Sequence, residues 1–168
     1  QKPKKYSFVS HAEMAEWIIK IAKMVEKEEG IPLSDMAVLF RINETLDHTK
    51  REVVKKFGKD STIPNFLTVH GSKGLEFPVV FLCDLEESVF PHYRLRRSHR
   101  IRTWGDLFRK LVIKRNADEI ECDFDEEKRL FYVGVTRAEK FLFLLTVKEK
   151  SMHGRKVLFR PSRFLKLL

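Results

Sequence analysis

The sequence has 168 residues, 43% of them hydrophobic, which is enough apolar material for one globular domain with a buried core and excludes a disordered tail. Lys and Arg outnumber Asp and Glu by 33 to 24, for a formal net charge of +9. This basic excess favours a polyanionic partner. The two cysteines, Cys83 and Cys122, lie far apart and outside any CxxC spacing, so neither a disulfide framework nor a zinc site is predicted.

Membrane and secretory classes are not indicated. No apolar run approaches the roughly 18 residues of a membrane span, and the basic start lacks the apolar stretch of a signal peptide. We therefore expect a cytoplasmic protein with no membrane partner. The chain begins with Gln1 instead of Met, which suggests a fragment of a longer protein.

The first half of the chain alternates helix and strand patterns. Ser10 and Glu13 have the spacing of a capping box, and apolar residues then recur at helical intervals, which predicts a helix over 10–29. The wholly apolar run 36–40 is typical of a strand covered on both faces. A second helix is predicted over 44–57.

Two further strands are predicted at 66–69 and 79–83, joined by the Gly-containing turn 70–77. An acidic-started helix pattern at 125–138 leads into the apolar run 141–145. A hairpin around His153-Gly154 and a last helix over 161–168 complete the expected elements. Helices alternating with apolar strands predict an α/β fold with a parallel sheet.

The basic excess is concentrated between residues 94 and 115, where nine Lys and Arg residues face only one acid, Asp106. A solvated surface insertion and a nucleic-acid contact both remain open. Trp104 and Phe108 could stack on bases, or at i, i+4 they could anchor a short helix to the core. We treat 94–120 as a basic insertion or mobile loop within one domain that spans 1–168.

Ligands of parallel α/β sheets gather at the carboxyl ends of strands, so the segments after Phe40 and Val69 are the first candidates for chemistry. Arg41 follows the first of these strands. After the second, small residues allow close approach of the backbone, and Lys73 offers a point charge for phosphate. From the residues alone, Gly71 and Gly74 could equally serve the turn, and Arg41 could equally form a surface ion pair.

Three segments together resemble the UvrD/Rep-type superfamily 1 DNA helicases. Residues 68–82 (Thr-Val-His-Gly-Ser-Lys-Gly-Leu-Glu-Phe-Pro-Val-Val-Phe-Leu) resemble motif V, residues 125–138 resemble motif VI, and residues 37–43 resemble motif IV, in the family's order. The resemblance implies the second, C-terminal RecA-like motor domain of such a helicase: a mostly parallel sheet flanked by helices, without its own P-loop.

The resemblance also implies roles for single residues. Arg41 and Arg137 would be catalytic arginine fingers that reach the γ-phosphate of ATP. Phe40 stands where the family usually carries a tyrosine that stacks on adenine, and Glu76 matches the acid that contacts the nucleotide sugar. Three further positions match residues that face single-stranded DNA or couple it to the nucleotide: Thr68, His70 and Lys73.

Some parts of a complete motor are absent from the sequence. No G-x-x-x-x-G-K-[ST] phosphate cradle occurs, so ATP and Mg²⁺ are expected only in the full-length protein, and the fragment alone should be inactive and nucleotide-free. We also expect the fragment to be monomeric. We interpret the acids 125–127 as helix-starting charges and predict no metal site. Only a short helix and a turn lie between Asn43 and Phe66, where UvrD and Rep carry an accessory domain.

The leading hypothesis is one half of an ATP-dependent helicase or translocase that binds single-stranded DNA and acts with the first RecA-like motor domain of the same protein. One alternative is a non-catalytic nucleic-acid-binding module with a RecA-like fold. Arg41 and Arg137 argue against it, because a pure binding module needs no γ-phosphate sensors. The motor part of a helicase-nuclease is a further alternative.

Overall fold

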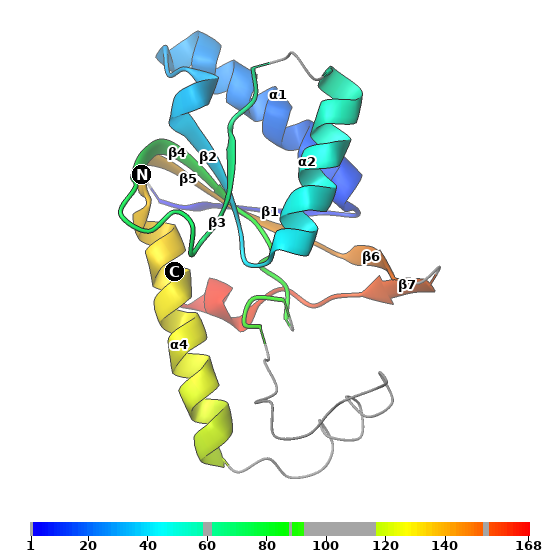
Figure 1. Ribbon diagram of the computed structural model, residues 1–168, viewed down its shortest axis with the longest axis vertical. Coiled ribbons are helices and arrows are strands. Elements are labelled where there is room, and N and C mark those ends of the chain that lie inside the picture. Colours follow the sequence, from blue (N-terminus) through cyan, green and yellow to red (C-terminus); the bar gives the residue numbers. More distant parts are fainter. Residues whose placement is uncertain (1, 59–61, 88, 93–116, 153–154) are drawn as a thin grey trace.

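The computed structural model describes residues 2–58, 62–87, 89–92, 117–152 and 155–168 (Figure 1). The basic stretch 94–115, with Trp104 and Phe108, lies outside these residues. Its two interpretations therefore stay predictions.

The first predicted helix is confirmed as α1 (His11–Glu29). Ser10 caps it, because its Oγ accepts a hydrogen bond from the Glu13 N–H at 3.3 Å while Glu13 Oε2 accepts one from the Val9 N–H at 2.7 Å. The helix ends at Gly30, whose φ of 67° lies in the left-handed region that glycine adopts without strain.

The predicted alternation continues through the middle of the chain. A 3-10 turn, η1 (Leu33–Asp35), leads into strand β2 (Met36–Phe40), all of whose residues are buried. Helix α2 (Asn43–Phe57) follows. The next two strands are β3 (Asn65–Thr68) and β4 (Phe77–Leu82), each within two residues of its predicted start.

Five strands form one parallel sheet in the order β1-β5-β4-β2-β3. Strand β5 (Ala138–Val147) is longer than the apolar run that predicted it. Strand β1 (Lys4–Phe8) was not predicted, because its two lysines interrupt the apolar pattern. It is an edge strand that pairs only with β5, so its outer side chains can stay in solvent.

The two faces of the sheet are covered by different helices (Figure 1). Met14, Ile18 and Ala22 of α1 pack on one face, against Val38 of β2 and Phe81 of β4. Helix α2 packs beside α1 on the same face, through a small cluster that includes Ile19 and Val53. Helix α4 (Ala117–Thr136) covers the opposite face with Phe131 against Leu82 and Leu144.

Helix α4 packs very closely on the sheet at Gly134. A Cβ atom at this position would lie 3.0 Å from Leu82 Cδ1 and 3.5 Å from Val69 Cγ1. Glycine therefore lets the end of the helix approach β4. This close contact fixes the position of Arg137, which follows the helix directly.

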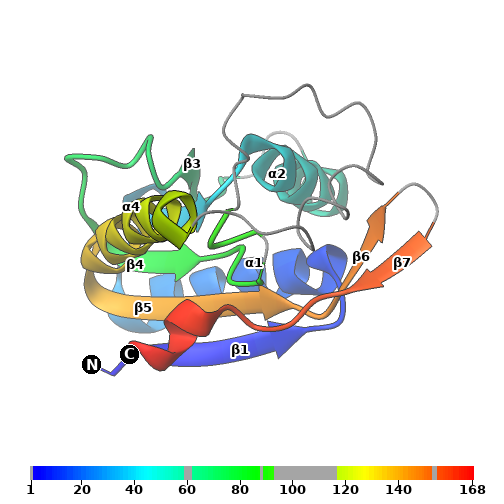
Figure 2. The same ribbon diagram turned by 90° about the horizontal axis from the view of Figure 1, so that it is seen from below.

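Two predictions for the C-terminal half were wrong in extent. Helix α4 begins at Ala117, not Asp125, so the acids 125–127 lie within the helix and do not start it. The last four residues of the segment 94–120, which was predicted as an insertion or loop, also belong to this helix. The predicted helix 161–168 is only a 3-10 turn, η2 (Arg163–Lys166), in which Phe164 is buried. Figure 2 shows this turn beside β1, where Lys5 Nζ donates to the Leu165 carbonyl at 2.6 Å.

The hairpin prediction is confirmed by the antiparallel strands β6 (Glu149–Met152) and β7 (Arg155–Leu158), which flank residues 153–154. Within the described ranges, no helix combines the length and the apolar character that crossing a membrane requires.

Candidate functional site

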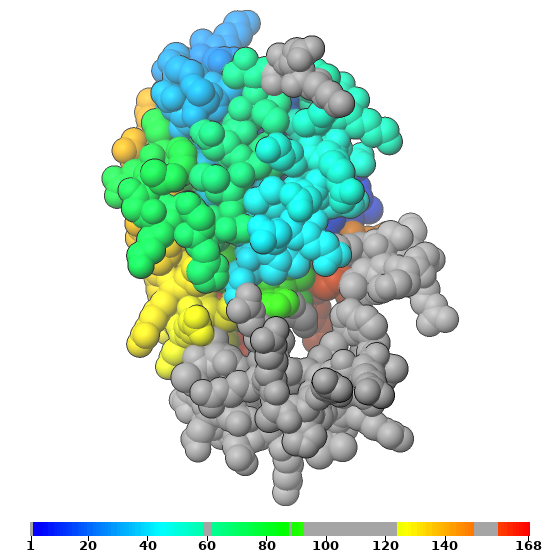
Figure 3. All heavy atoms as spheres, in the orientation of Figure 1, coloured from blue at the N-terminus to red at the C-terminus, as the bar shows by residue number. Residues whose placement is uncertain are grey.

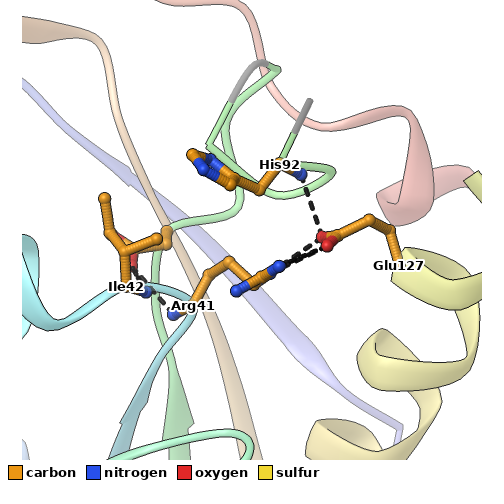
Figure 4. Close-up of polar contacts among 5 residues, drawn as sticks. Arg41, Ile42, His92 and Glu127 are labelled. Carbon is orange, nitrogen blue, oxygen red and sulfur yellow. Dashed lines mark hydrogen bonds and ion pairs between the residues drawn. The ribbon is translucent and has the colours of Figure 1, made fainter. Parts of the chain in front are cut away.

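Arg41 lies just beyond the carboxyl end of β2, and its side chain is buried, with 5% exposure. Its Nε donates to Glu127 Oε2 at 2.8 Å and to Oε1 at 3.1 Å, and its Nη2 also donates to Glu127 Oε1. Figure 4 shows the guanidinium of Arg41 pointing directly at this carboxylate of α4. The ion pair considered for Arg41 therefore exists, but it is buried and bidentate instead of lying on the surface.

The backbone around Arg41 is held by Asp84, which follows β4 and is almost fully buried. Its Oδ2 accepts from the Arg41 N–H at 2.9 Å, from the Thr45 hydroxyl at 2.6 Å and from the Ile42 N–H at 3.4 Å. Asp84 itself has a φ of 63°, a conformation that Asp tolerates better than most residues. This carboxylate fixes where the chain leaves β2 and hence where the Arg41 side chain starts.

Asp84→Ala should lower the free energy of unfolding of the chain by about 2 kcal/mol or more, because it leaves buried donors without an acceptor and places alanine at positive φ. Asp84→Asn keeps an acceptor oxygen and tolerates this φ, so it should cost clearly less. Urea unfolding of both variants measures the difference. Equal losses would show that Asp84 does not act through these hydrogen bonds.

Cys83 precedes Asp84 and is fully buried. Burial raises the pKa of the Cys83 thiol well above its ordinary value, and the negative charges of Asp84 and Glu86 raise it further. The thiol therefore stays protonated at neutral pH and serves as a small apolar group.

The loop 69–76 between β3 and β4 is shaped by its own hydrogen bonds. The Thr68 hydroxyl accepts from the Gly71 N–H at 3.1 Å, and the buried Ser72 hydroxyl donates to the Val69 carbonyl at 2.8 Å. Gly74 has a φ of 81°, a left-handed conformation that glycine adopts without strain, which explains why glycine occupies this position. Gly71 serves the turn as well, since an added Cβ would lie 3.2 Å from Thr68 Oγ1.

The polar side chains of this loop are directed outward. His70, Lys73 and Glu76 are exposed, whereas Thr68 is half-buried. Figure 3 shows the loop (green), α2 (cyan) and part of α4 (yellow) on one face of the molecule. The loop therefore presents a basic group, an imidazole and a carboxylate to a partner without disturbing its own turn.

Arg137 lies between the end of α4 and the start of β5 and is partly exposed. Its Nε donates to the Val133 carbonyl at 3.1 Å, its Nη1 to the Leu75 carbonyl at 2.8 Å and its Nη2 to Thr136 Oγ1 at 3.4 Å. In the described part of the chain, no carboxylate lies within ion-pair distance of it. The guanidinium is thus oriented by neutral acceptors and keeps its positive charge available to an anion.

Phe40 is buried in the domain as the structure describes it. Its side chain has 0% exposure, belongs to the core under α1, and stacks on Phe66 with ring centroids 6.1 Å apart. The packing explains this placement, since β2 is an interior strand between β4 and β3 and both its faces are covered. For Phe40 to contact a base, the ring would have to leave the core.

The structure divides the predicted site residues between two ends of the sheet. Phe40 and Thr68 are register partners at the carboxyl ends of β2 and β3, beside Arg41. Glu76 and Arg137 lie at the amino ends of β4 and β5, where the Phe77 N–H donates to the Arg137 carbonyl at 2.8 Å.

Arg41 and Arg137 contact different parts of helix α4. Arg41 is attached to α4 at Glu127 and Arg137 at Val133, six residues further on, which is about 9 Å along the helix. The two guanidiniums are thus held at different points along α4.

Sequence reasoning missed the residues that orient Arg41. Glu127 was interpreted as a helix-starting charge, but it is buried and pairs with Arg41. Asp84 was not singled out at all. A single acid directly after an apolar strand, as Asp84 is, was the one available signal, because parallel sheets place such residues beside their ligands. Among the described residues, no group of three or more His, Cys, Asp or Glu side chains is arranged to hold a metal ion.

The fold and these residues define a parallel α/β domain that presents polar loops and oriented arginines but has no phosphate-binding loop in its sequence. The UvrD-like helicase C-terminal domain family matches residues 52–149. The chain belongs to this family.

Individual relatives agree with this assignment. The chain is 36% identical over 170 residues to a probable DNA helicase of Mycoplasma pneumoniae, which covers 99% of this chain and 27% of the relative. It is 38% identical over 133 residues to the ATP-dependent DNA helicase PcrA of Bacillus subtilis, covering 79% of this chain and 14% of the relative. The chain thus spans between about a seventh and a quarter of the length of these relatives.

A solved structure supports the fold. The C-terminal domain of a possible DNA helicase from Lactobacillus plantarum aligns over 88% of this chain and 74% of its own length, with a TM-score of 0.54. The sequence identity is 13%, so this likeness concerns the fold alone. It confirms the predicted α/β architecture.

Proposed function

We propose that this UvrD-like C-terminal domain is the second motor domain of an ATP-dependent DNA helicase or translocase and that it completes an ATP site held by the first motor domain. The observation that carries this proposal is Arg137, a guanidinium oriented by the carbonyls of Val133 and Leu75 and without a carboxylate partner among the described residues. A preorganised, uncompensated positive charge is what a developing phosphate charge requires.

Arg41 is the second proposed arginine finger. It follows β2 at the carboxyl edge of the sheet, where ligands of parallel α/β folds are bound. Both arginines belong to this domain, and they would reach the nucleotide when the first motor domain, which holds it, closes over this face. ATP would supply the phosphoryl group for hydrolysis, and Mg²⁺ would be held by acids of the first motor domain.

Glu76 is proposed to contact the nucleotide sugar, which fits its exposed place in the loop before β4. Its carboxylate can accept hydrogen bonds from hydroxyl groups. Phe40 can stack on the base only after its ring leaves the core. In the present conformation we assign it a structural role as the buried residue directly before Arg41.

Single-stranded DNA is the proposed polymer substrate, and Thr68, His70 and Lys73 are the proposed contacts. Lys73 and His70 are exposed on a turn whose shape is fixed by internal hydrogen bonds. A turn of this kind can bind the phosphate groups of a DNA strand. Its Leu75 carbonyl accepts a hydrogen bond from Arg137, so the turn also contacts the proposed arginine finger.

A non-catalytic nucleic-acid-binding module would also use Lys73 and His70. Arg137 distinguishes the two functions by the effect of its loss: in a binding module the loss would weaken DNA binding, whereas in a motor domain it would lower ATP turnover while DNA still binds. The motor part of a helicase-nuclease makes the same use of both arginines and differs only in other domains.

Lys73→Ala should weaken binding of the full-length protein to a fluorescent oligo-dT by about 3-fold or more at 0.1 M NaCl and reduce the slope of log K against log [NaCl] by roughly 0.7, the value of one phosphate contact on a single strand. Fluorescence anisotropy over several salt concentrations measures both. Lys20→Ala, an exposed lysine of α1, is the matched control. Identical slopes for the two variants would remove Lys73 from the DNA interface.

A further inference from the structure

Glu127 is a buried acid for which the proposed function has so far given no role. It lies on α4 with 6% exposure and contacts two other segments of the chain. Its Oε1 and Oε2 both accept from Arg41, and Oε2 also accepts from the His92 backbone N–H at 2.9 Å (Figure 4). The carboxylate thus cannot rotate without breaking its contacts to Arg41 or to the His92 backbone.

These contacts fix the orientation of the Arg41 guanidinium. Glu127 occupies its Nε and Nη2 edge, and the ring of the buried Phe90 lies 6.0 Å from the guanidinium carbon. Among the described residues, Nη1 of Arg41 has no hydrogen-bond acceptor. One edge of the guanidinium is therefore held in place, and the Nη1 edge remains for another acceptor.

Stability alone does not account for such a pair. Desolvation of two charges offsets much of their attraction, and a buried ion pair is often no more stabilising than apolar side chains of similar volume. Holding a planar, forked donor in one direction is what a bidentate carboxylate does better than an apolar neighbour.

We propose that Glu127 is a positioning residue for ATP hydrolysis, which holds Arg41 so that its Nη1 edge is directed at a phosphate oxygen of the nucleotide. This inference rests on the proposed function of Arg41. Glu127 itself touches neither nucleotide nor DNA.

The test is ATP turnover of the full-length protein at saturating single-stranded DNA, with Glu127→Asp and Glu127→Gln each made in the wild-type and the Arg41→Ala backgrounds. Glu127→Asp keeps the charge and shortens the side chain by one methylene, which displaces the guanidinium. We expect kcat to fall about 10-fold or more and KM for ATP to change less than about 3-fold, because positioning errors of this size act on the chemical step. In the Arg41→Ala background the same change should alter kcat by less than about 2-fold.

Glu127→Gln removes the charge and should lower kcat at least as much as Glu127→Asp. Thermal unfolding checks that the Glu127→Gln protein is folded. If it is not folded, the test rests on Glu127→Asp alone. Glu126→Gln, a neighbouring exposed acid on α4, is the matched control and should leave kcat unchanged. A wild-type kcat for Glu127→Asp, or equal losses in both backgrounds, would overturn the positioning role alone. Wild-type turnover of Arg41→Ala would overturn the proposed function of Arg41 and this inference with it.

Discussion

Replacing Arg137 with alanine should lower the DNA-stimulated ATP turnover of the full-length protein by about 10³-fold or more, while ATP and single-stranded DNA still bind. The reason is the placement of the guanidinium: Val133 and Leu75 orient it, and no described carboxylate neutralises it. Such a group acts mainly on the charge that develops in the transition state, so kcat should fall far more than the affinity for ATP. Steady-state kinetics with separate binding titrations measures both effects.

Two further variants sharpen this prediction. Arg137→Lys keeps the charge but cannot bridge the two carbonyls with a planar fork, so it should recover only a small part of the lost turnover. Arg129→Ala removes an exposed arginine from the same helix and should leave turnover unchanged. If Arg129→Ala and Arg137→Ala had the same effect, the loss would reflect a general change in charge.

Arg41→Ala should affect both stability and turnover. It leaves the buried Glu127 carboxylate without its counter-ion, and breaking a buried pair in this way costs about 3–5 kcal/mol of unfolding free energy. Turnover of the full-length protein should fall by about 10²-fold or more for lack of the second finger. Urea unfolding of the chain and steady-state ATP hydrolysis measure the two effects separately.

The double variant Arg41→Ala/Glu127→Ala separates the two consequences. Because it removes both charges, it should be more stable than Arg41→Ala alone, yet it should hydrolyse ATP no faster. Recovery of turnover together with stability would show that Arg41 serves only the fold.

The sequence predicted the interior of the sheet well, because β2, most of β4 and the second half of β5 are buried, and each of these strands contains an uninterrupted apolar run. Strand β1 was not predicted, because most of its residues are not buried and it contains no uninterrupted apolar run. An edge strand covered on one side can carry lysines, and only its pairing with β5 makes it a strand.

The motifs located the candidate residues in the sequence but not their environments. Nothing in the residues 125–127 shows which of three adjacent acids faces inward, because this depends on where α4 begins and how it lies on the sheet. Helix α4 starts at Ala117, and the resulting register turns Glu127 toward Arg41. Burial of Phe40 likewise depends on the packing of Phe66 and α1 around it, which a motif does not contain.

The neutral hydrogen-bond acceptors of Arg137 also depend on tertiary packing and could not be predicted from the motif. Leu75 and Arg137 are 62 positions apart in the sequence, and only the return of the loop 69–76 to the amino end of β4 brings them together. The close approach of α4 at Gly134 fixes that meeting point. The motif resemblance thus identifies the arginine, and the fold explains why its charge is available.

The most direct test of the central claim is the single-stranded DNA-stimulated ATPase activity of the full-length protein, compared with its Arg41→Ala and Arg137→Ala variants at saturating ATP and DNA. We predict that both variants lose turnover by orders of magnitude and still bind nucleotide and DNA. If both retained wild-type turnover, the arginines would not complete an ATP site, and the domain would instead be a nucleic-acid-binding module.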